Sequence, residues 1–120
     1  MTTSCEPGAT PTDGPLAKRK CIPCEGGIPK LEPDEIATFL KQLNSAWTVV
    51  DGHHLRRNYT FSDFAGALAF VNRVGALAEE NGHHPDLFLT WGKAAVELHT
   101  HAVNGLTETD FILAAKIDEL

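Results

Sequence analysis

The chain has 120 residues, of which 42% are hydrophobic, and a formal net charge of −6 at pH 7. This length allows one small domain. The basic runs Lys18-Arg19-Lys20 and Arg56-Arg57 are too short to form a phosphate-binding surface, so we expect no nucleic-acid partner. No segment approaches the roughly 20 apolar residues of a membrane span, and no apolar signal segment opens the chain. We therefore expect a cytoplasmic protein with no membrane contact.

The first thirty residues are rich in proline and glycine and carry no periodic apolar pattern. We predict an irregular or disordered N-terminal extension over 1–30 and a folded domain over 31–120. The extension contains a CxxC pair, Cys21 and Cys24. A zinc ribbon needs a second such pair or two histidines at matching spacing, and a thioredoxin-like site needs a preceding strand and a following helix. Neither context is present, so this pair supports no function by itself.

The folded domain opens with a helix that we predict over 33–44. Pro33 suits a first helical turn, and the apolar residues that follow recur at helical spacing. A strand over 47–50, an Asp51-Gly52 turn and a returning strand over 55–61 then form a predicted hairpin.

A long helix follows, which we predict over 62–81 with Ser62 as its N-cap and Gly82 as its C-cap. Its apolar positions form two rows on different faces. One row is Phe64, Leu68 and Val71, and the other is Phe70, Val74 and Leu77. This apolar surface is wider than one sheet face requires. We therefore expect the helix to form a subunit interface in a homodimer or homotetramer.

The last part of the chain predicts a second hairpin and a final helix. Strands are expected over 87–91 and 94–102, joined by a Gly92-Lys93 turn. In the second strand, His99 and His101 fall on the polar face. A capping-box pattern, Thr107 to Asp110, opens the final helix. The predicted fold is α+β in the order α-β-β-α-β-β-α, with a four-stranded antiparallel sheet and helices packed on one face.

Glu79, His83 and His84 lie at the end of the long helix, just before Pro85, and His101 follows on the next hairpin. Histidine gains and loses protons near neutral pH, so this group suits either proton transfer or metal binding. A metal site could combine His99 and His101 with His83 and Glu79. Adjacent side chains such as His83 and His84 diverge, however, and no HExxH pattern is present. We therefore favour acid/base chemistry without a metal.

These residues, taken with Trp91 and Asp110, reproduce in order and spacing the signature of a known family. Glu79, His83-His84-Pro85, Trp91, His101 and Asp110 resemble the motif of the pterin-4a-carbinolamine dehydratases, and the resemblance covers about 31–120. It implies removal of water from a 4a-hydroxytetrahydropterin to give quinonoid dihydropterin, in tetrahydrobiopterin recycling. It also implies that no cofactor is required.

The resemblance implies a role for each matched residue. His83 and His101 would be the acid/base pair, with the assignment of acid and base left open. His84 would bind or orient the pterin, and Glu79 would hold an imidazole by a hydrogen bond. Trp91 would shape the wall of the substrate site or stack on the pterin, and Asp110 would cap the last helix.

Three other histidines, His53, His54 and His99, are expected to be polar surface residues outside the site. Two alternative functions remain open for this fold. One is a pterin-related role in molybdenum-cofactor metabolism. The other is a dimerisation or coactivator-type binding module that uses the apolar helix surface.

Overall fold

The structure is a computed structural model that describes residues 15–19 and 29–120. The CxxC pair Cys21–Cys24 lies outside the described residues. The elements, in chain order, are η1 (Leu16–Lys18), α1 (Pro33–Leu40), β1 (Thr48–Val50), β2 (His54–Thr60), α2 (Phe64–Asn81), β3 (Asp86–Thr90), β4 (Lys93–Leu98), η3 (His101–Val103) and α3 (Glu108–Asp118). The predicted α+β fold and its element order are confirmed.

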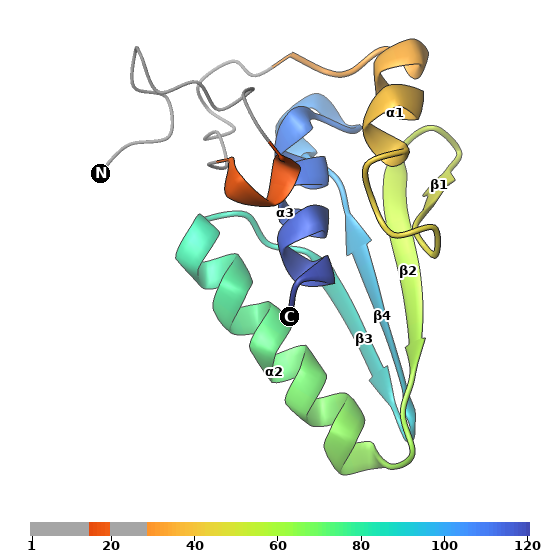
Figure 1. Ribbon diagram of the computed structural model, residues 1–120, viewed down its shortest axis with the longest axis vertical. Helices are drawn as coiled ribbons and strands as arrows, with labels where there is room; N and C mark the ends of the chain where they lie inside the picture. Colours follow the sequence, from red (N-terminus) through yellow and green to blue (C-terminus); the bar gives the residue numbers. More distant parts are fainter. Residues whose placement is uncertain (1–14, 20–28) are drawn as a thin grey trace.

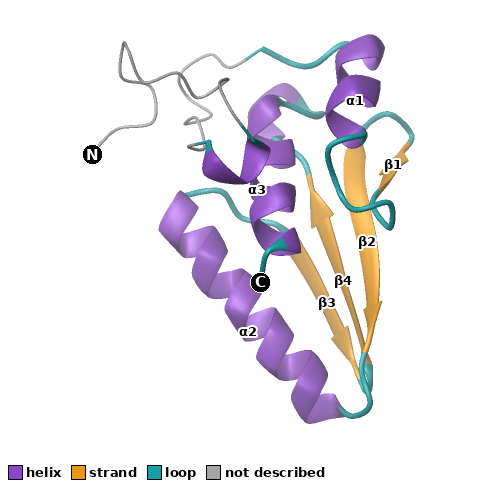
Figure 2. Cartoon of the chain, in the orientation of Figure 1, coloured by secondary structure: helices purple, strands orange, loops and turns teal. Residues whose placement is uncertain are grey.

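The four strands form one antiparallel sheet in the order β1-β2-β4-β3. The helices lie on one face of this sheet, with α3 over its centre and α2 along the β3 side (Figure 1). The other face carries no helix among the described residues (Figure 2). The short β1–β2 and β3–β4 connections enforce antiparallel pairing, since parallel neighbours would need a long crossover.

The core lies between the sheet and the helices. Leu55 and Leu98 are paired across β2 and β4, and both are fully buried. Phe111 of α3 and Val74 of α2 cover them from the helix side. The described segment 15–19 also packs on α3, because Leu16 is buried and the Lys116 Nζ donates a hydrogen bond to the Ala17 carbonyl. Part of the predicted extension therefore contributes to the core.

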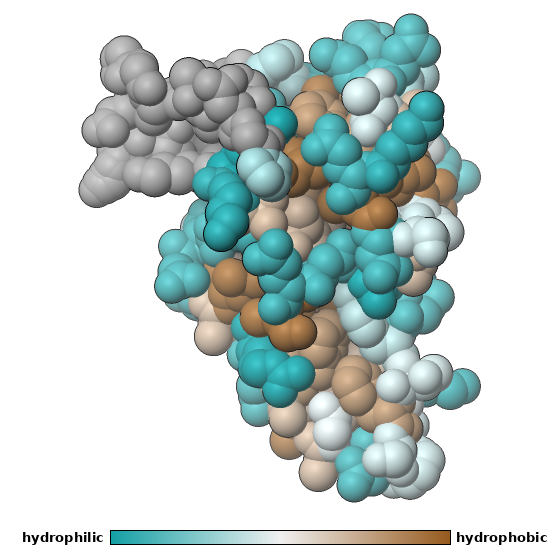
Figure 3. All heavy atoms as spheres, viewed as in Figure 1, coloured by the Kyte–Doolittle hydropathy of each residue, from teal (hydrophilic) through white to brown (hydrophobic). Residues whose placement is uncertain are grey.

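The two apolar rows of α2 have different environments. Phe70 packs against the Tyr59 ring at 4.3 Å between centroids, and Val74 is fully buried, so this row covers the sheet. Phe64 and Leu68 of the other row are 43% and 39% exposed. Apolar atoms reach the surface on the side where α2 runs (Figure 3). Val71, the third residue of this row, packs against the core, so Phe64 and Leu68 are the part of the row available for contact with another molecule.

Four predicted boundaries were wrong. Asp63, not Ser62, is the N-cap of α2, since its Oδ1 accepts a hydrogen bond from the Gly66 N–H at 2.8 Å. Helix α1 ends at Leu40, and i→i+3 hydrogen bonds tighten the chain into turns after it. The β3–β4 turn is Trp91-Gly92 rather than Gly92-Lys93, because Lys93 already pairs with both neighbouring strands.

The fourth boundary concerns the strand predicted to reach Ala102. Strand β4 ends at Leu98, and the chain then closes on itself through a bridge between Thr100 and Gly105. Asn104, with a φ of 52°, supplies the left-handed residue that this tight loop needs. The alternating pattern could not reveal the bridge, because the bridge joins positions outside the strand. No helix in the described part of the chain is long and apolar enough to cross a membrane.

Candidate active site

The carboxylate of Asp110 is fully buried, with 0% of the residue exposed. The capping-box prediction is confirmed, because the Thr107 N–H donates to Asp110 Oδ2 at 2.9 Å. Thr100 Oγ1 donates to the same oxygen at 2.9 Å. His83 Nε2 lies 2.6 Å from the other oxygen, Oδ1. Asp110 therefore caps α3 and also binds a candidate catalytic imidazole, a contact that the sequence analysis missed.

This contact fixes the hydrogen on the His83 ring. An ionised carboxylate can only accept hydrogen bonds, so in this contact His83 Nε2 carries a hydrogen and donates it. In the neutral ring, Nδ1 then holds the lone pair. Because His83 is 6% exposed, this buried pair defines the orientation of one imidazole.

The end of helix α2 places His83 at this position. Gly82 has a φ of 66°, as the predicted C-cap requires, and its N–H bonds the last helical turn. The next residue, His83, donates its backbone N–H to the Ala78 carbonyl. The left-handed residue turns the chain away from the helix axis. As a result the two consecutive histidines point in different directions.

His84 points outward and pairs with Glu79, one turn earlier on α2. His84 Nε2 lies 2.5 Å from Glu79 Oε2. Both side chains are more than half exposed, so water screens this pair. The carboxylate accepts a hydrogen bond from the imidazole. The geometry matches an orienting role for Glu79 toward His84.

His101 lies at the first position of η3 rather than on a strand, and its side chain is exposed. It nevertheless meets the other two histidines at a pocket of about 350 Å³. The lining residues are Gly82, His83, His84, Pro85, Asp86, His101 and Ala102. A pocket of this size suits a small bicyclic ligand. The structure therefore brings His83, His84 and His101 together.

Trp91 does not join this group within one chain. It lies at the β3–β4 turn and is 69% exposed. His84 and Pro85 lie just before the start of β3, and Trp91 lies just after its end. At a rise of about 3.4 Å per residue, Trp91 is therefore roughly 20 Å from His84 and Pro85. A contact between Trp91 and a ligand in this pocket would need a second chain.

A second hollow of about 410 Å³ lies on the open face of the sheet, where Arg56 covers the exposed Phe88 ring. It is larger than the histidine pocket but holds none of the candidate residues. Its lining contains no histidine or carboxylate, so the histidine pocket is the candidate active site.

The histidines that the sequence analysis set aside are not scattered over the surface. The His99 ring lies 4.1 Å from the His101 ring and 4.6 Å from the His53 ring, between centroids. The antiparallel register places the start of β2 beside the end of β4, which brings these residues together. Among the described residues, no group of three or more His, Cys, Asp or Glu side chains has a geometry that could hold a metal ion.

Comparison with known proteins defines the family. A family model described as Pterin 4 alpha carbinolamine dehydratase matches residues 29–120. A relative from Rubrobacter xylanophilus, provisionally named a pterin-4-alpha-carbinolamine dehydratase, is 52% identical over 105 residues, which is 88% of this chain and 97% of the relative. A relative from Alkaliphilus metalliredigens with the same provisional name is 49% identical over 104 residues, which is 87% of this chain and 94% of the relative.

Solved structures agree with this result. The crystal structure described as transcriptional coactivator/pterin dehydratase from Brucella Melitensis matches with a TM-score of 0.70 and 34% identity, covering 76% of this chain and 97% of that one. A pterin dehydratase-like protein identified as a RuBisCO assembly factor in the alpha-carboxysome matches with a TM-score of 0.53 and 24% identity, covering 62% of this chain and 87% of that one, and shows the fold alone. The chain belongs to the pterin 4 alpha carbinolamine dehydratase family.

Proposed function

We propose that this protein removes water from a 4a-hydroxytetrahydropterin by histidine acid/base catalysis, as a step of tetrahydrobiopterin recycling. Family membership supports the reaction class. The observation that carries the mechanism is the convergence of His83, His84 and His101 on one pocket, with His83 held by the buried Asp110. The Glu79–His84 contact adds a second oriented imidazole.

The reaction needs one proton donor and one proton acceptor. The hydroxyl on C4a leaves as water when it receives a proton, and the N5 proton departs as the double bond between C4a and N5 forms. An imidazolium supplies the first proton and a neutral imidazole takes the second. The two rings exchange protonation states in each turnover, and solvent restores them. Each such group contributes typically ~10²–10⁴-fold to the rate.

His83 is suited to be the base. Its Nε2–H is donated to Asp110, so in the neutral ring Nδ1 is the atom with a free lone pair. The imidazolium that forms when Nδ1 takes a proton would lie beside an ionised carboxylate. A buried carboxylate orients a catalytic histidine in this way in other proton-transfer sites.

His101 is suited to be the acid, and His84 to bind the substrate. His101 is exposed at the pocket, where it can recover its proton from water. His84 lies on the same lining and is oriented by Glu79. In this arrangement the pterin lies between a buried base and a solvent-linked acid, with His84 as an orienting hydrogen-bond partner.

A coupled assay tests this function. A 4a-hydroxytetrahydropterin is generated in situ, and the rise of quinonoid dihydropterin absorbance is followed with and without the purified protein. We expect acceleration over the spontaneous reaction, and a loss of about 10²-fold or more in kcat/KM for His83→Ala. His54→Ala is the matched control, because His54 does not line the pocket and should retain activity.

A second function is favoured by one observation, the exposed apolar row of α2. Phe64 and Leu68 remain exposed although Ala67 and Phe70 beside them are buried. Burial of such residues against a like surface is a common source of stability for small domains. We propose that α2 forms a homodimer or homotetramer interface. The same surface could bind another protein, as the coactivator description of the Brucella structure suggests for that protein.

A further inference from the structure

A row of four imidazoles lies beside the candidate active site. Its members are His54, His53, His99 and His101, contributed by β2, the β1–β2 turn, the residue after β4 and η3. Successive ring centroids are 5.3, 4.6 and 4.1 Å apart. These separations are within the range of direct aromatic contact. The row ends at His101, which lines the pocket.

His53 anchors the row to the segment that carries His101. Its Nε2 lies 3.0 Å from Asn104 Oδ1, and its Nδ1 lies 3.1 Å from His54 Nδ1. Because the amide oxygen accepts, His53 Nε2 carries the hydrogen, and His53 Nδ1 accepts from His54. Asn104 closes the short η3 turn that begins at His101. The β1–β2 turn and η3 are thus tied together across the end of the sheet.

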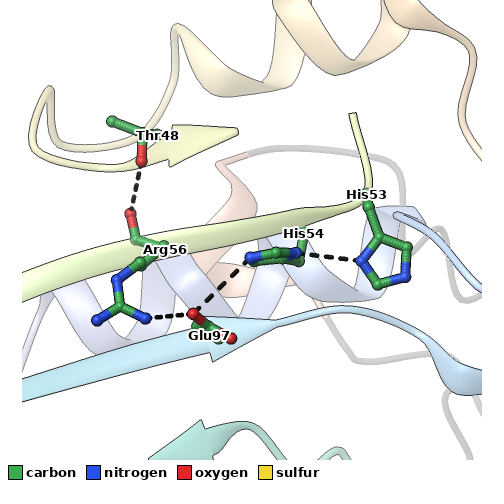
Figure 4. A network of polar contacts seen from close by, with 5 residues as sticks. All are labelled: Thr48, His53, His54, Arg56 and Glu97. Carbon is green, nitrogen blue, oxygen red and sulfur yellow. Dashed lines mark hydrogen bonds and ion pairs between the residues drawn. The ribbon is translucent and has the colours of Figure 1, made fainter. Parts of the chain in front are cut away.

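At the far end of the row, His54 contacts both His53 and the carboxylate of Glu97. His54 Nε2 lies 3.8 Å from Glu97 Oε2, and Glu97 also pairs with Arg56 (Figure 4). His54 is turned toward both its histidine neighbour and the carboxylate (Figure 4).

His99, in the middle of the row, is held neutral. Burial lowers the pKa of His99, and the neighbouring His101 and His53 rings lower it further, while Asp110 and Asp86 act in the opposite direction. Its ring is therefore a planar uncharged surface at neutral pH. Such a surface can pack against either protonation state of the adjacent ring.

Each histidine of the pocket has a different partner. His83 has the carboxylate of Asp110, and His84 has that of Glu79. The ring of His101 makes no hydrogen bond with any described residue, and its ring contact is with His99. An exposed side chain without fixed contacts samples several rotamers, so it loses more conformational entropy when it adopts one orientation. The His99 ring packs against the His101 ring and can therefore restrict its orientation.

We propose that His99, anchored through His53, is a positioning residue that orients the His101 ring toward the pterin. The expected effect on kcat rests on the proposed function, whereas the expected effect on the His101 ring does not. His99 does not line the pocket, so it acts through His101 rather than on the substrate. The property that matters is a planar neutral ring, and a phenyl group shares it.

The test compares His99→Ala with His99→Phe in the same dehydratase assay. Because contact between two rings contributes modestly, we expect His99→Ala to lower kcat by about threefold to tenfold with little change in KM. His99→Phe should keep kcat within about twofold of the unchanged protein, since it retains the ring contact. His54→Ala, at the far end of the row, is the matched control and should leave kcat unchanged.

NMR of the imidazole protons gives a readout that does not depend on activity. The His101 ring signals should move in His99→Ala, because the neighbouring ring current is lost, and should stay close to their original place in His99→Phe. Equal losses of kcat in the two variants, or unchanged His101 signals in His99→Ala, would overturn the positioning role. If the unchanged protein shows no dehydratase activity, the proposed function fails, and the NMR comparison still decides the positioning role.

Discussion

At the scale of single residues, the sequence analysis predicted which histidines lie together better than it predicted their individual contacts. It placed His83, His84 and His101 in one site because their types and spacing match a family motif, and the structure brings them to one pocket. It treated Asp110 only as a helix cap. The second contact of Asp110, with His83, joins residues 27 positions apart, so local pattern alone could not reveal it.

Asp110→Asn tests whether this carboxylate supports both the fold and the site. An amide has one acceptor oxygen, whereas Asp110 accepts from His83, Thr100 and the Thr107 N–H. At least one buried donor would lose its partner, which costs about 1–3 kcal/mol. Urea unfolding should show this loss in the free energy of unfolding. The dehydratase rate should fall as well, since His83 loses its orienting partner; a variant with unchanged stability and rate would contradict this role.

Tyr59 gives a prediction for the pH dependence of stability. Burial raises the pKa of Tyr59 to about 12, with Asp118 adding to this effect and Arg57 opposing it. In the unfolded chain the phenol ionises near its ordinary value of about 10. The folded state therefore binds the proton more tightly, and its contribution is full below pH 10 and is lost as the pH rises toward 12.

Tyr59→Phe should remove this dependence. The Tyr59 hydroxyl is buried without a hydrogen-bond partner among the described residues, so its loss should not lower stability at pH 7. Thermal melting of both proteins from pH 7 to 11 should show a smaller decline for the phenylalanine variant. Parallel declines would show that Tyr59 titrates equally in both states.

At the scale of elements, the order and type of the three α-helices and four strands followed from periodicity and turn residues, while their ends and the short helices η1 and η3 did not. Ser62 and Asp63 are both good N-caps, and only the three-dimensional structure shows that Asp63 reaches Gly66. The strand pattern continued through His99 and His101, but the Thr100–Gly105 bridge ends β4 and places His101 on η3. Local signals thus predict the elements, whereas the particular hydrogen bonds that form in three dimensions set their ends.

The end of α2 can be tested with two substitutions of one glycine. Gly82 has a φ of 66°, and no atom lies within 4 Å of the position of an added Cβ. Any cost therefore comes from the backbone conformation. Gly82→Ala should lower the free energy of unfolding by about 1 kcal/mol, and Gly82→Asn by less, because asparagine tolerates the left-handed region better.

Denaturant titration of the two Gly82 variants measures this difference directly. Equal costs for both substitutions would show that the side-chain environment, not the backbone, limits this position. Because His83 follows directly, the alanine variant should also lower dehydratase activity if it shifts the histidine.

At the scale of the whole molecule, the helix layer covers one face of the sheet and leaves one row of α2 exposed. Phe64→Asp and Leu68→Asp place charge on this row without touching the core. Sedimentation analysis should show a smaller particle for these variants than for the unchanged protein. Phe70→Asp is a poor test, because Phe70 packs against Tyr59 and Phe61 within the same chain. An unchanged particle size in both exposed-row variants would contradict the interface proposal.

We propose that the pocket lined by His83, His84 and His101 dehydrates a pterin carbinolamine. The most direct measurement is the rate at which quinonoid dihydropterin appears from a 4a-hydroxytetrahydropterin, compared among the spontaneous reaction, the unchanged protein and His83→Ala. We expect clear acceleration by the unchanged protein and loss of about 10²-fold or more in kcat/KM in His83→Ala, with folding retained. A spontaneous rate that the unchanged protein does not exceed, or full activity in a folded His83→Ala variant, would contradict it.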